Sequence, residues 1–340
     1  MGETIIGAED FTAELAWWTD AAGLRLDAIW PADDPQVARL SGRGLALRLE
    51  RGPGAPVRLR VDAGASGTSP AGHRIETGPP VPPCAMPRVQ TGFGLRRLAD
   101  GAPWVIGRAG MHYRDLVPDR LGGAIVASHI RIPDGGPVPD MVHFHTIGFQ
   151  LIHCHRGWVD LVYEDHGPPF RLRAGESVTQ PPGIRHRVLE ASPAIERVEI
   201  GVPAVHVTTI GRAMARPNTA APVPGRTWDG QRFVHDVPRA DGWRPAARPG
   251  LIARDTGIGA ATGGVAGVRL LRRGEDASAP YAETAEIHFT FVKAGALALE
   301  IEGRRHRAEA SDAFVLPPGA PVLYDEATAD LELLEVTLPG

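Results

Sequence analysis

The chain has 340 residues, more than one hydrophobic core usually serves, so its length predicts two or three domains. Its formal net charge of -4, with both signs spread along the sequence, provides no basic stripe and excludes nucleic acid as an expected partner. The 41 glycines and 32 prolines, beside an ordinary 43% of hydrophobic residues, indicate many short elements joined by turns and therefore a mainly β fold.

The sequence lacks the signals of a membrane or secreted protein. The N-terminus shows no basic region followed by an apolar run, and no stretch of roughly 18 apolar residues occurs. Cys84 and Cys154 have no CxxC spacing and do not make a disulfide framework. We therefore expect a cytoplasmic protein with no membrane partner.

Residues 1–63 are predicted to form a small α/β unit. The segment FTAELAWWTDAAG places Phe11, Leu15 and Trp18 at helical spacing and ends at Gly23. Strand patterns follow in LRLDAIW, GLALRLER and VRLRVD. This βαβββ-like order resembles one module of the glyoxalase, or vicinal-oxygen-chelate, superfamily. A plain docking role is the alternative, because the segment carries no metal motif.

The remaining chain is predicted to contain two similar β domains. Residues 64–104 are rich in glycine, proline and serine and are interpreted as a linker. Residues 105–206 contain short β-like runs separated by turn residues, the rhythm of a barrel or sandwich. After a connection at 207–249 the pattern returns at 250–340, where HFTFVKAGALALEIEG and DAFVLPPG correspond to FQLIHCHRGWVDLVYED and SVTQPPG. Internal duplication explains this correspondence.

Four side chains of the first repeat have the chemistry of metal ligands. His143 and His145 are two residues apart, so on a strand both imidazoles point to one face and can bind one ion. Gln150 follows after a short turn, and His186 follows the proline- and glycine-rich turn GESVTQPPG. These stretches resemble the cupin motifs HxHx4(E/Q)x6G and Gx5PxGx2H, whose turn positions here are Gly157, Gly175, Pro181 and Gly183.

The resemblance to the cupin superfamily implies a double-stranded β-helix barrel that holds one divalent metal on His143, His145, Gln150 and His186. Pro137 stands where the motif has an early glycine, and Glu190 where it has a closing asparagine. These positions shape turns and leave the ligand set intact. The predicted fold is therefore mainly β: a bicupin of two tandem cupin barrels, preceded by the small α/β unit.

The second repeat serves as an internal comparison for the first. When Gly295 is aligned with Gly157, the ligand positions become Tyr281, Glu283, His288 and Val322. The three-histidine set is lost, so the second barrel is interpreted as degenerate: structural, or a shaping wall and dimer surface, with an apolar or weakly polar ligand cavity as the alternative.

Other polar and apolar positions of the first repeat were assigned by strand parity. His153 and His155 form another HxH pair, but they fall opposite Gln150 and are interpreted as surface or packing residues. Ile152 and Val188 are candidates for the wall of the ligand pocket. His129 is a further candidate, with a satisfied core or surface histidine as the alternative.

Three imidazoles and one amide leave the charge of a divalent ion unbalanced, which favours a small anionic oxygen chelator as substrate. Iron(II) is the preferred metal; zinc, manganese, nickel or cobalt can occupy such a site. We expect an iron(II) dioxygenase that acts on a small enolisable or phenolic anion. The alternatives are a redox-neutral isomerase, cyclase or lyase, and a noncatalytic ligand-binding cupin. The catalytic base stays unassigned, because nothing fixes the direction of Asp140, Glu164 or Glu190. A homodimer is expected, since pairing would cover barrel edges.

Overall fold

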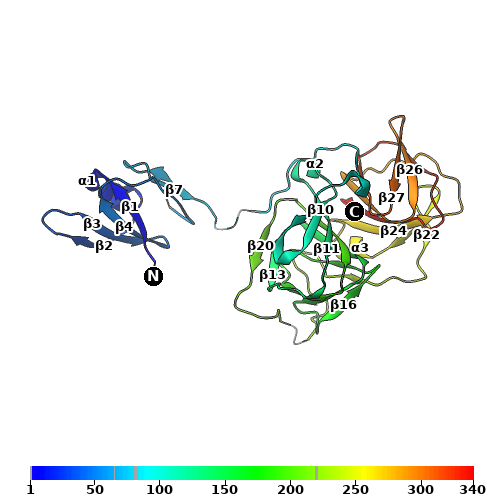
Figure 1. Ribbon diagram of the computed structural model, residues 1–340, viewed down its shortest axis with the longest axis horizontal. Coiled ribbons are helices and arrows are strands. Elements are labelled where there is room, and N and C mark those ends of the chain that lie inside the picture. Colours follow the sequence, from blue (N-terminus) through cyan, green and yellow to red (C-terminus); the bar gives the residue numbers. More distant parts are fainter. Residues whose placement is uncertain (1, 65, 80, 82, 219–220) are drawn as a thin grey trace. The chain divides into compact units, whose positions relative to one another are not determined.

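The structure, a computed structural model, describes residues 2–64, 66–79, 81, 83–218 and 221–340. Its contacts divide the chain into two units, Met1–Pro83 and Cys84–Gly340 (Figure 1). Strands make up most of the regular structure in both units, so the predicted mainly β fold is confirmed. Among the described helices, none has the length and apolar character that a bilayer crossing requires.

The first part of the first unit is a four-stranded sheet with a helical segment packed on it. The side chain of Asp10 caps the helix by accepting a hydrogen bond from the backbone of Ala13, and the helical segment ends before Gly23, whose φ is +67°. The sheet has the order β1-β4-β3-β2, in which β1 is parallel to β4 and the others are antiparallel. The elements are β1 (Thr4–Ala8), α1 (Phe11–Ala16), η1 (Trp17–Ala21), β2 (Arg25–Trp30), β3 (Val37–Gly42) and β4 (Leu45–Arg51).

The predicted boundary of this unit at residue 63 is too early. Strand β5 (Arg58–Val61) does not join the first sheet; it pairs with β7 (Arg74–Thr77), which also pairs with β6 (Gly67–Thr68). Ile75 of β7 is 1% exposed and belongs to the core of this unit. The segment interpreted as a linker therefore contains strands. They are too short for their alternation to stand out among glycines, prolines and serines.

The second unit contains a first barrel of two facing sheets. One sheet has the order β21-β17-β14-β19-β11-β10-β9, and the other has the order β16-β15-β18-β13-β20, with β12 added to β18. The elements are β9 (Val105–Ile106), β10 (His112–Asp115), β11 (Val126–Ile132), β12 (Gly136–Pro137), β13 (His143–Thr146), β14 (Phe149–Arg156), β15 (Trp158–Tyr163), β16 (Phe170–Arg173), β17 (Ser177–Thr179), β18 (His186–Ala191), β19 (Ile195–Val202), β20 (Val207–Ile210) and β21 (His235–Asp236).

A second barrel repeats this plan. Its larger sheet has the order β22-β23-β24-β30-β25-β28-β8, and its smaller sheet has the order β27-β26-β29. The elements are β8 (Gly94–Arg96), β22 (Arg244–Pro245), β23 (Leu251–Asp255), β24 (Gly267–Arg273), β25 (Ile287–Ala294), β26 (Ala296–Ile301), β27 (Arg304–Glu309), β28 (Ala313–Leu316), β29 (Val322–Asp325) and β30 (Glu332–Leu338). The short helical segments are η2 (Leu98–Asp100), η3 (Arg108–Gly110), α2 (Arg120–Gly123) and α3 (Ile258–Ala261).

The two barrels exchange strands. Strand β8 precedes the first barrel in sequence but pairs with β28 of the second, and β21 precedes the second barrel but pairs with β17 of the first. Strand β20 also lies within the stretch predicted as a connection, and it pairs with β13. The predicted linker and connection thus contribute strands to both barrels. Their few residues gave no pattern in the sequence.

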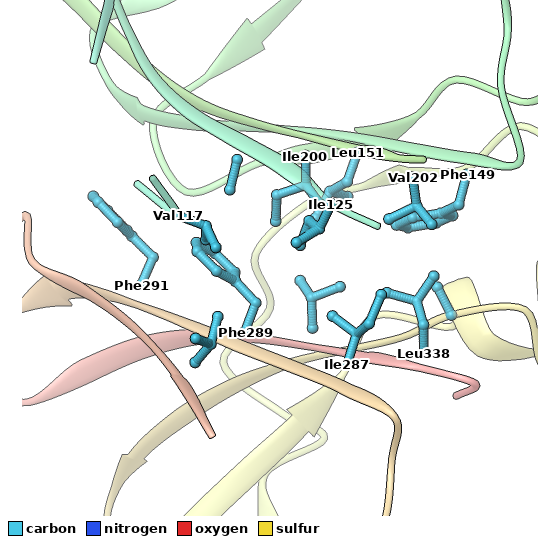
Figure 2. Close-up of a cluster of buried hydrophobic side chains, with 14 of the residues drawn as sticks. Val117, Ile125, Phe149, Leu151, Ile200, Val202, Ile287, Phe289, Phe291 and Leu338 are labelled. Atoms are coloured by element: carbon cyan, nitrogen blue, oxygen red, sulfur yellow. The ribbon is translucent and has the colours of Figure 1, made fainter. Parts of the chain in front are cut away.

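A continuous apolar layer joins the barrels. Figure 2 shows Leu151, Ile200 and Val202 of the first barrel facing Ile287 and Phe289 of the second, and all five belong to one buried cluster. The outer faces of β14 and β25 are therefore covered, which explains why both strands are buried on both sides along most of their length.

His153 and His155 lie on this outer face of β14. His153 is fully buried and its Nδ1 lies 2.9 Å from the hydroxyl of Ser177, while the ring of His155 lies 5.2 Å from that of Phe291. His153 and His155 were interpreted as surface or packing residues, and in the structure they are packing residues.

Candidate metal centre

Three histidines of the first barrel gather at one point. His143 and His145 come from β13, and His143 is paired in register with His186 of β18. One ring nitrogen from each histidine lies within 4.8 Å of the others, and all three side chains are buried. The two-residue spacing places His143 and His145 on one face of their strand, as expected. The described part of the chain holds no other such cluster of histidine, cysteine or carboxylate groups.

The glycine- and proline-rich turn delivers the third histidine. Gly175 and Gly183 have φ values of +89° and +81°, a backbone conformation that favours glycine. The backbone N–H of Gly183 donates to the carbonyl of His145 at 2.9 Å, and that of Ile184 donates to the carbonyl of Pro181 at 3.1 Å. These bonds tie the turn to β13 and place His186 beside the other imidazoles.

Gly157 closes the turn between β14 and β15. Its φ is +74°, and a Cβ atom there would lie 2.3 Å from the hydroxyl of Ser192. Only glycine fits this turn without rearrangement.

Each imidazole is oriented by a group behind it. Nδ1 of His143 lies 2.7 Å from the carbonyl of Met141, and Nδ1 of His186 lies 3.0 Å from that of Ile184. Nδ1 of His145 lies 3.0 Å from the hydroxyl of Thr208. With a proton on Nδ1 donated to these oxygens, the lone pair of each Nε2 can bind an ion, in His143 once the hydrogen bond from Arg108 to its Nε2 is released.

Burial keeps these imidazoles neutral. It lowers the pKa of His145 to about 2, with help from His143 and His206, and lowers the pKa of His186 well below its ordinary value. Burial and the charge of Arg108 also lower the pKa of His143. The neutral form is the one that binds a metal, so no proton has to be removed near pH 7.

Gln150 points into the same barrel. It is 1% exposed and lies on the face of β14 that carries Ile152 of the inner core. Its Nε2 donates to Oε1 of Glu199 at 2.9 Å, which fixes the amide, and its Oε1 is buried without a hydrogen-bond partner among the described residues. A buried acceptor of this kind costs free energy unless a ligand satisfies it. Three imidazoles and this oxygen fit a divalent transition metal.

Sequence reasoning missed four residues around the cluster, which no motif marks. Glu199 holds Gln150, and Arg108 donates through Nη2 to Nε2 of His143 at 3.0 Å. His206 places its ring 5.4 Å from that of His145. Tyr163 stacks on His186 at 5.5 Å and accepts a hydrogen bond from Gln180; burial raises its pKa.

The three carboxylates near the motifs point in different directions. Asp140 is buried, forms an ion pair with Arg108 and accepts a hydrogen bond from the backbone of Val188 at 2.9 Å. Glu164 pairs with Arg185 at 3.0 Å, and Glu190 is exposed. Of the three, Asp140 therefore belongs to the site, where it positions Arg108.

The predicted pocket residues divide into two groups. Ile152 and Val188 lie in the inner core cluster of the first barrel together with Tyr163. His129 does not belong to this cluster. It lies on the face of β11 opposite to Ile130, which is part of the cluster.

His129 instead contacts polar and aromatic groups outside that core. Its Nε2 lies 2.8 Å from Glu196, and its ring lies 5.2 Å from Trp104 and 5.7 Å from Phe291 of the second barrel. The structure therefore contradicts the assignment of His129 to the pocket and agrees with the alternative, a satisfied core histidine. Both faces of β11 are buried, so its sequence did not reveal which face is inside.

Glu199→Ala is expected to weaken metal binding roughly 10–100-fold, because the amide of Gln150 would lose the group that orients it. Glu199→Gln is the matched control, since its side-chain oxygen can still accept the hydrogen bond from Gln150. Titration against a competing chelator measures both affinities. Equal affinities for Glu199→Ala and the wild type would remove Glu199 from the site.

Comparisons with known proteins agree with this description at the level of the fold. No family model matches the sequence, and no curated protein sequence does. The salicylate 1,2-dioxygenase of Pseudaminobacter salicylatoxidans matches with a TM-score of 0.54 and 16% identity, over 75% of this chain and 86% of that chain. A variant of that enzyme in complex with gentisate matches with a TM-score of 0.54 and 17% identity, over 75% of this chain and 84% of that chain.

A second kind of protein has a similar structure. The protein YlbA of E. coli matches with a TM-score of 0.51 and 15% identity, over 75% of this chain and 95% of that chain. At these identities the likeness concerns the fold alone. It supports the predicted cupin fold, whereas the glyoxalase-like module stays a prediction.

Proposed function

We propose that this chain is a metal-dependent cupin enzyme, an iron(II) dioxygenase that acts on a small phenolic or enolisable anion. The observation that carries the proposal is the convergence of three buried, neutral imidazoles in a barrel that also contains the buried amide oxygen of Gln150, which has no partner among the described residues. When bound to His143, His145, His186 and Gln150, a divalent metal would supply Lewis-acid and redox chemistry.

The neutral ligand set selects the charge of the substrate. The carboxylate of Glu199 accepts a hydrogen bond from Nε2 of Gln150, so it contacts the nitrogen of the amide and not the proposed ligand oxygen. No proposed ligand carries a negative charge that would offset the ion. An anionic oxygen group on the substrate would supply that charge.

Arg108 is the proposed anchor for the substrate anion. Its side chain is 37% exposed, so it can be reached from solvent, and its ion pair with the fully buried carboxylate of Asp140 holds it at the site. Its Nη2 now donates to the Nε2 of His143, the lone pair that a metal would use. A guanidinium and a metal ion cannot share that lone pair, so Arg108 would release His143 and present Nη2 to a carboxylate or phenolate.

The interior of the barrel would exclude water from the reacting part of the substrate. Tyr163, Ile152 and Val188 are at most 4% exposed and belong to the same core cluster. The gentisate complex of the dioxygenase of similar fold makes phenolic carboxylates the first substrates to test.

The test is oxygen consumption by the full chain loaded anaerobically with iron(II). With salicylate, gentisate, catechol and acetylacetone as the panel, uptake that depends on both iron and one of these substrates is expected. Arg108→Ala should raise KM for a carboxylate substrate by at least roughly tenfold, the loss of one charge-assisted pair, whereas Arg108→Lys should recover part of it. His153→Ala is the control that keeps full uptake.

The isomerase, cyclase or lyase alternative predicts a different pattern. The same panel would then be converted without oxygen, and zinc would support the conversion as well as iron. Metal binding without oxygen uptake or conversion of any panel member would contradict the dioxygenase proposal for this substrate class and favour a ligand-binding cupin.

A further inference from the structure

The second barrel keeps part of the site that the first barrel builds. His143 faces His186 in the first barrel, and Tyr281 faces Val322 at the corresponding place in the second. Gln150 bonds to Glu199 at 2.9 Å, and its counterpart His288 bonds through Nε2 to Glu335, also at 2.9 Å. The histidine ligands are lost in the second barrel. The hydrogen-bonded pair Gln150–Glu199 is retained there as His288–Glu335.

An arginine also recurs at the same place in both barrels. Tyr113 of β10 pairs with Ile130, and Ala253 of β23 pairs with Leu271 at the equivalent register. Arg108 precedes Tyr113 by five residues, and Arg248 precedes Ala253 by five residues.

Both arginines contact the equivalent position on the inner face. Arg108 reaches His143, and the guanidinium of Arg248 lies 5.0 Å from the ring centroid of Tyr281, the counterpart of His143. The duplication thus placed a guanidinium in each barrel.

Arg248 is a buried cation without a carboxylate partner among the described residues. It is 4% exposed, and its Nη1 donates only to the backbone carbonyls of Val322 at 3.0 Å and Tyr281 at 3.4 Å. Its Nε and Nη2 have no hydrogen-bond partner in the part of the chain that the structure describes. A charged group in this state is costly unless something pairs with it.

The nearby carboxylates are already engaged elsewhere. Glu335 lies 2.8 Å from Arg269 and also binds His288, and Glu283 lies 3.3 Å from Arg269. Burial alone would raise the pKa of Glu335, but His288, Arg269 and Arg248 outweigh it and lower the pKa to about 2. Arg269 is thus neutralised directly, while Arg248 is left with two free donors on one edge of its guanidinium.

Further polar groups without an assigned role surround Arg248. The ring centroid of Tyr324 lies 3.9 Å from its guanidinium. The hydroxyls of Tyr324 and Thr290 lie close enough to interact with each other, and neither has a hydrogen-bond partner in a third described residue. Nδ1 of His288, on the same face of β25 as Thr290, is also buried and has no hydrogen-bond partner within the described ranges. A barrel with a purely structural role would fill this place with apolar side chains.

We propose that the second barrel binds a small carboxylate at the place that corresponds to the metal centre of the first. Nε and Nη2 of Arg248 form a fork that matches the two carboxylate oxygens, and the hydroxyls of Tyr324 and Thr290 add hydrogen bonds. An open pocket of about 400 Å³, lined in part by Arg269, Glu283 and Thr337, lies in the same barrel, although Arg248, Tyr324 and Thr290 are not among the residues that line it. This site requires no metal and is independent of the proposed oxygenase activity.

The test is calorimetric titration of the metal-free full chain with acetate and benzoate, in an Arg108→Ala background that removes the guanidinium of the first barrel. One carboxylate per chain is expected to bind. Arg248→Met should weaken binding at least roughly tenfold, because a charge-assisted hydrogen-bonded pair is lost. Arg273→Met, at the exposed end of β24, is the matched control and should bind as tightly as the parent.

A second variant covers the case in which Arg248→Met does not fold. Tyr324→Phe keeps the ring and removes one hydroxyl, and it should weaken binding roughly 3–10-fold. The proposal is overturned if neither acid binds, if Arg248→Met or Tyr324→Phe binds as tightly as its parent, or if benzyl alcohol binds as tightly as benzoate.

Discussion

His186→Ala is expected to abolish stoichiometric metal binding. The substitution removes one of three imidazoles that lie within 4.8 Å of one another, and it leaves the other two on a single strand without the ligand that faces them from β18. His143→Ala should have the same effect, since His143 is paired in register with His186. Elemental analysis measures the metal content per chain. The protein is purified without added metal or a nickel column and is dialysed exhaustively before the analysis.

Two other histidines serve as controls for this experiment. His153 packs between the barrels and His288 lies in the second barrel, so His153→Ala and His288→Ala should keep about the metal content of the wild type. Full retention of metal by folded His186→Ala would contradict the assignment.

Phe289→Ala is expected to lower the free energy of unfolding of the two-barrel unit by about 3–5 kcal/mol. Phe289 is fully buried in the cluster that joins the barrels, and Figure 2 shows it facing the first barrel. Truncation would remove a large apolar surface and leave a cavity between two sheets that cannot close it. Urea denaturation followed by circular dichroism measures the change.

Val237→Ala provides the comparison, because Val237 is 44% exposed in a loop and its truncation should change the free energy of unfolding by less than about 0.5 kcal/mol. A loss below about 1 kcal/mol for Phe289→Ala would mean that the barrels do not share a core.

The place of His186, which lies on another strand than His143 and His145, was expected from the resemblance of its glycine- and proline-rich turn to a cupin motif. The relative direction of His143 and His145 was predictable because it is local: a two-residue spacing on one strand fixes it. The longer strands could be identified for the same reason, since each one contains its own alternation.

What the sequence did not reveal depends on contacts between distant segments. Glu199 meets Gln150 only because β19 pairs with β14, and Arg108 meets His143 only once the barrel has closed. The exchange of β8 and β21 was hidden because each is too short for a periodic pattern. His129 was misplaced because its strand is buried on both faces, so that apolar character did not mark the inner side.

The most direct test of the account is a crystallographic anomalous-difference map of the protein purified without added metal, recorded at the absorption edge of the metal that elemental analysis finds. The account predicts one strong peak per chain, bound by Nε2 of His143, His145 and His186 and by Oε1 of Gln150. A fully ordered histidine cluster without a peak, or a peak bound by other residues, would contradict it.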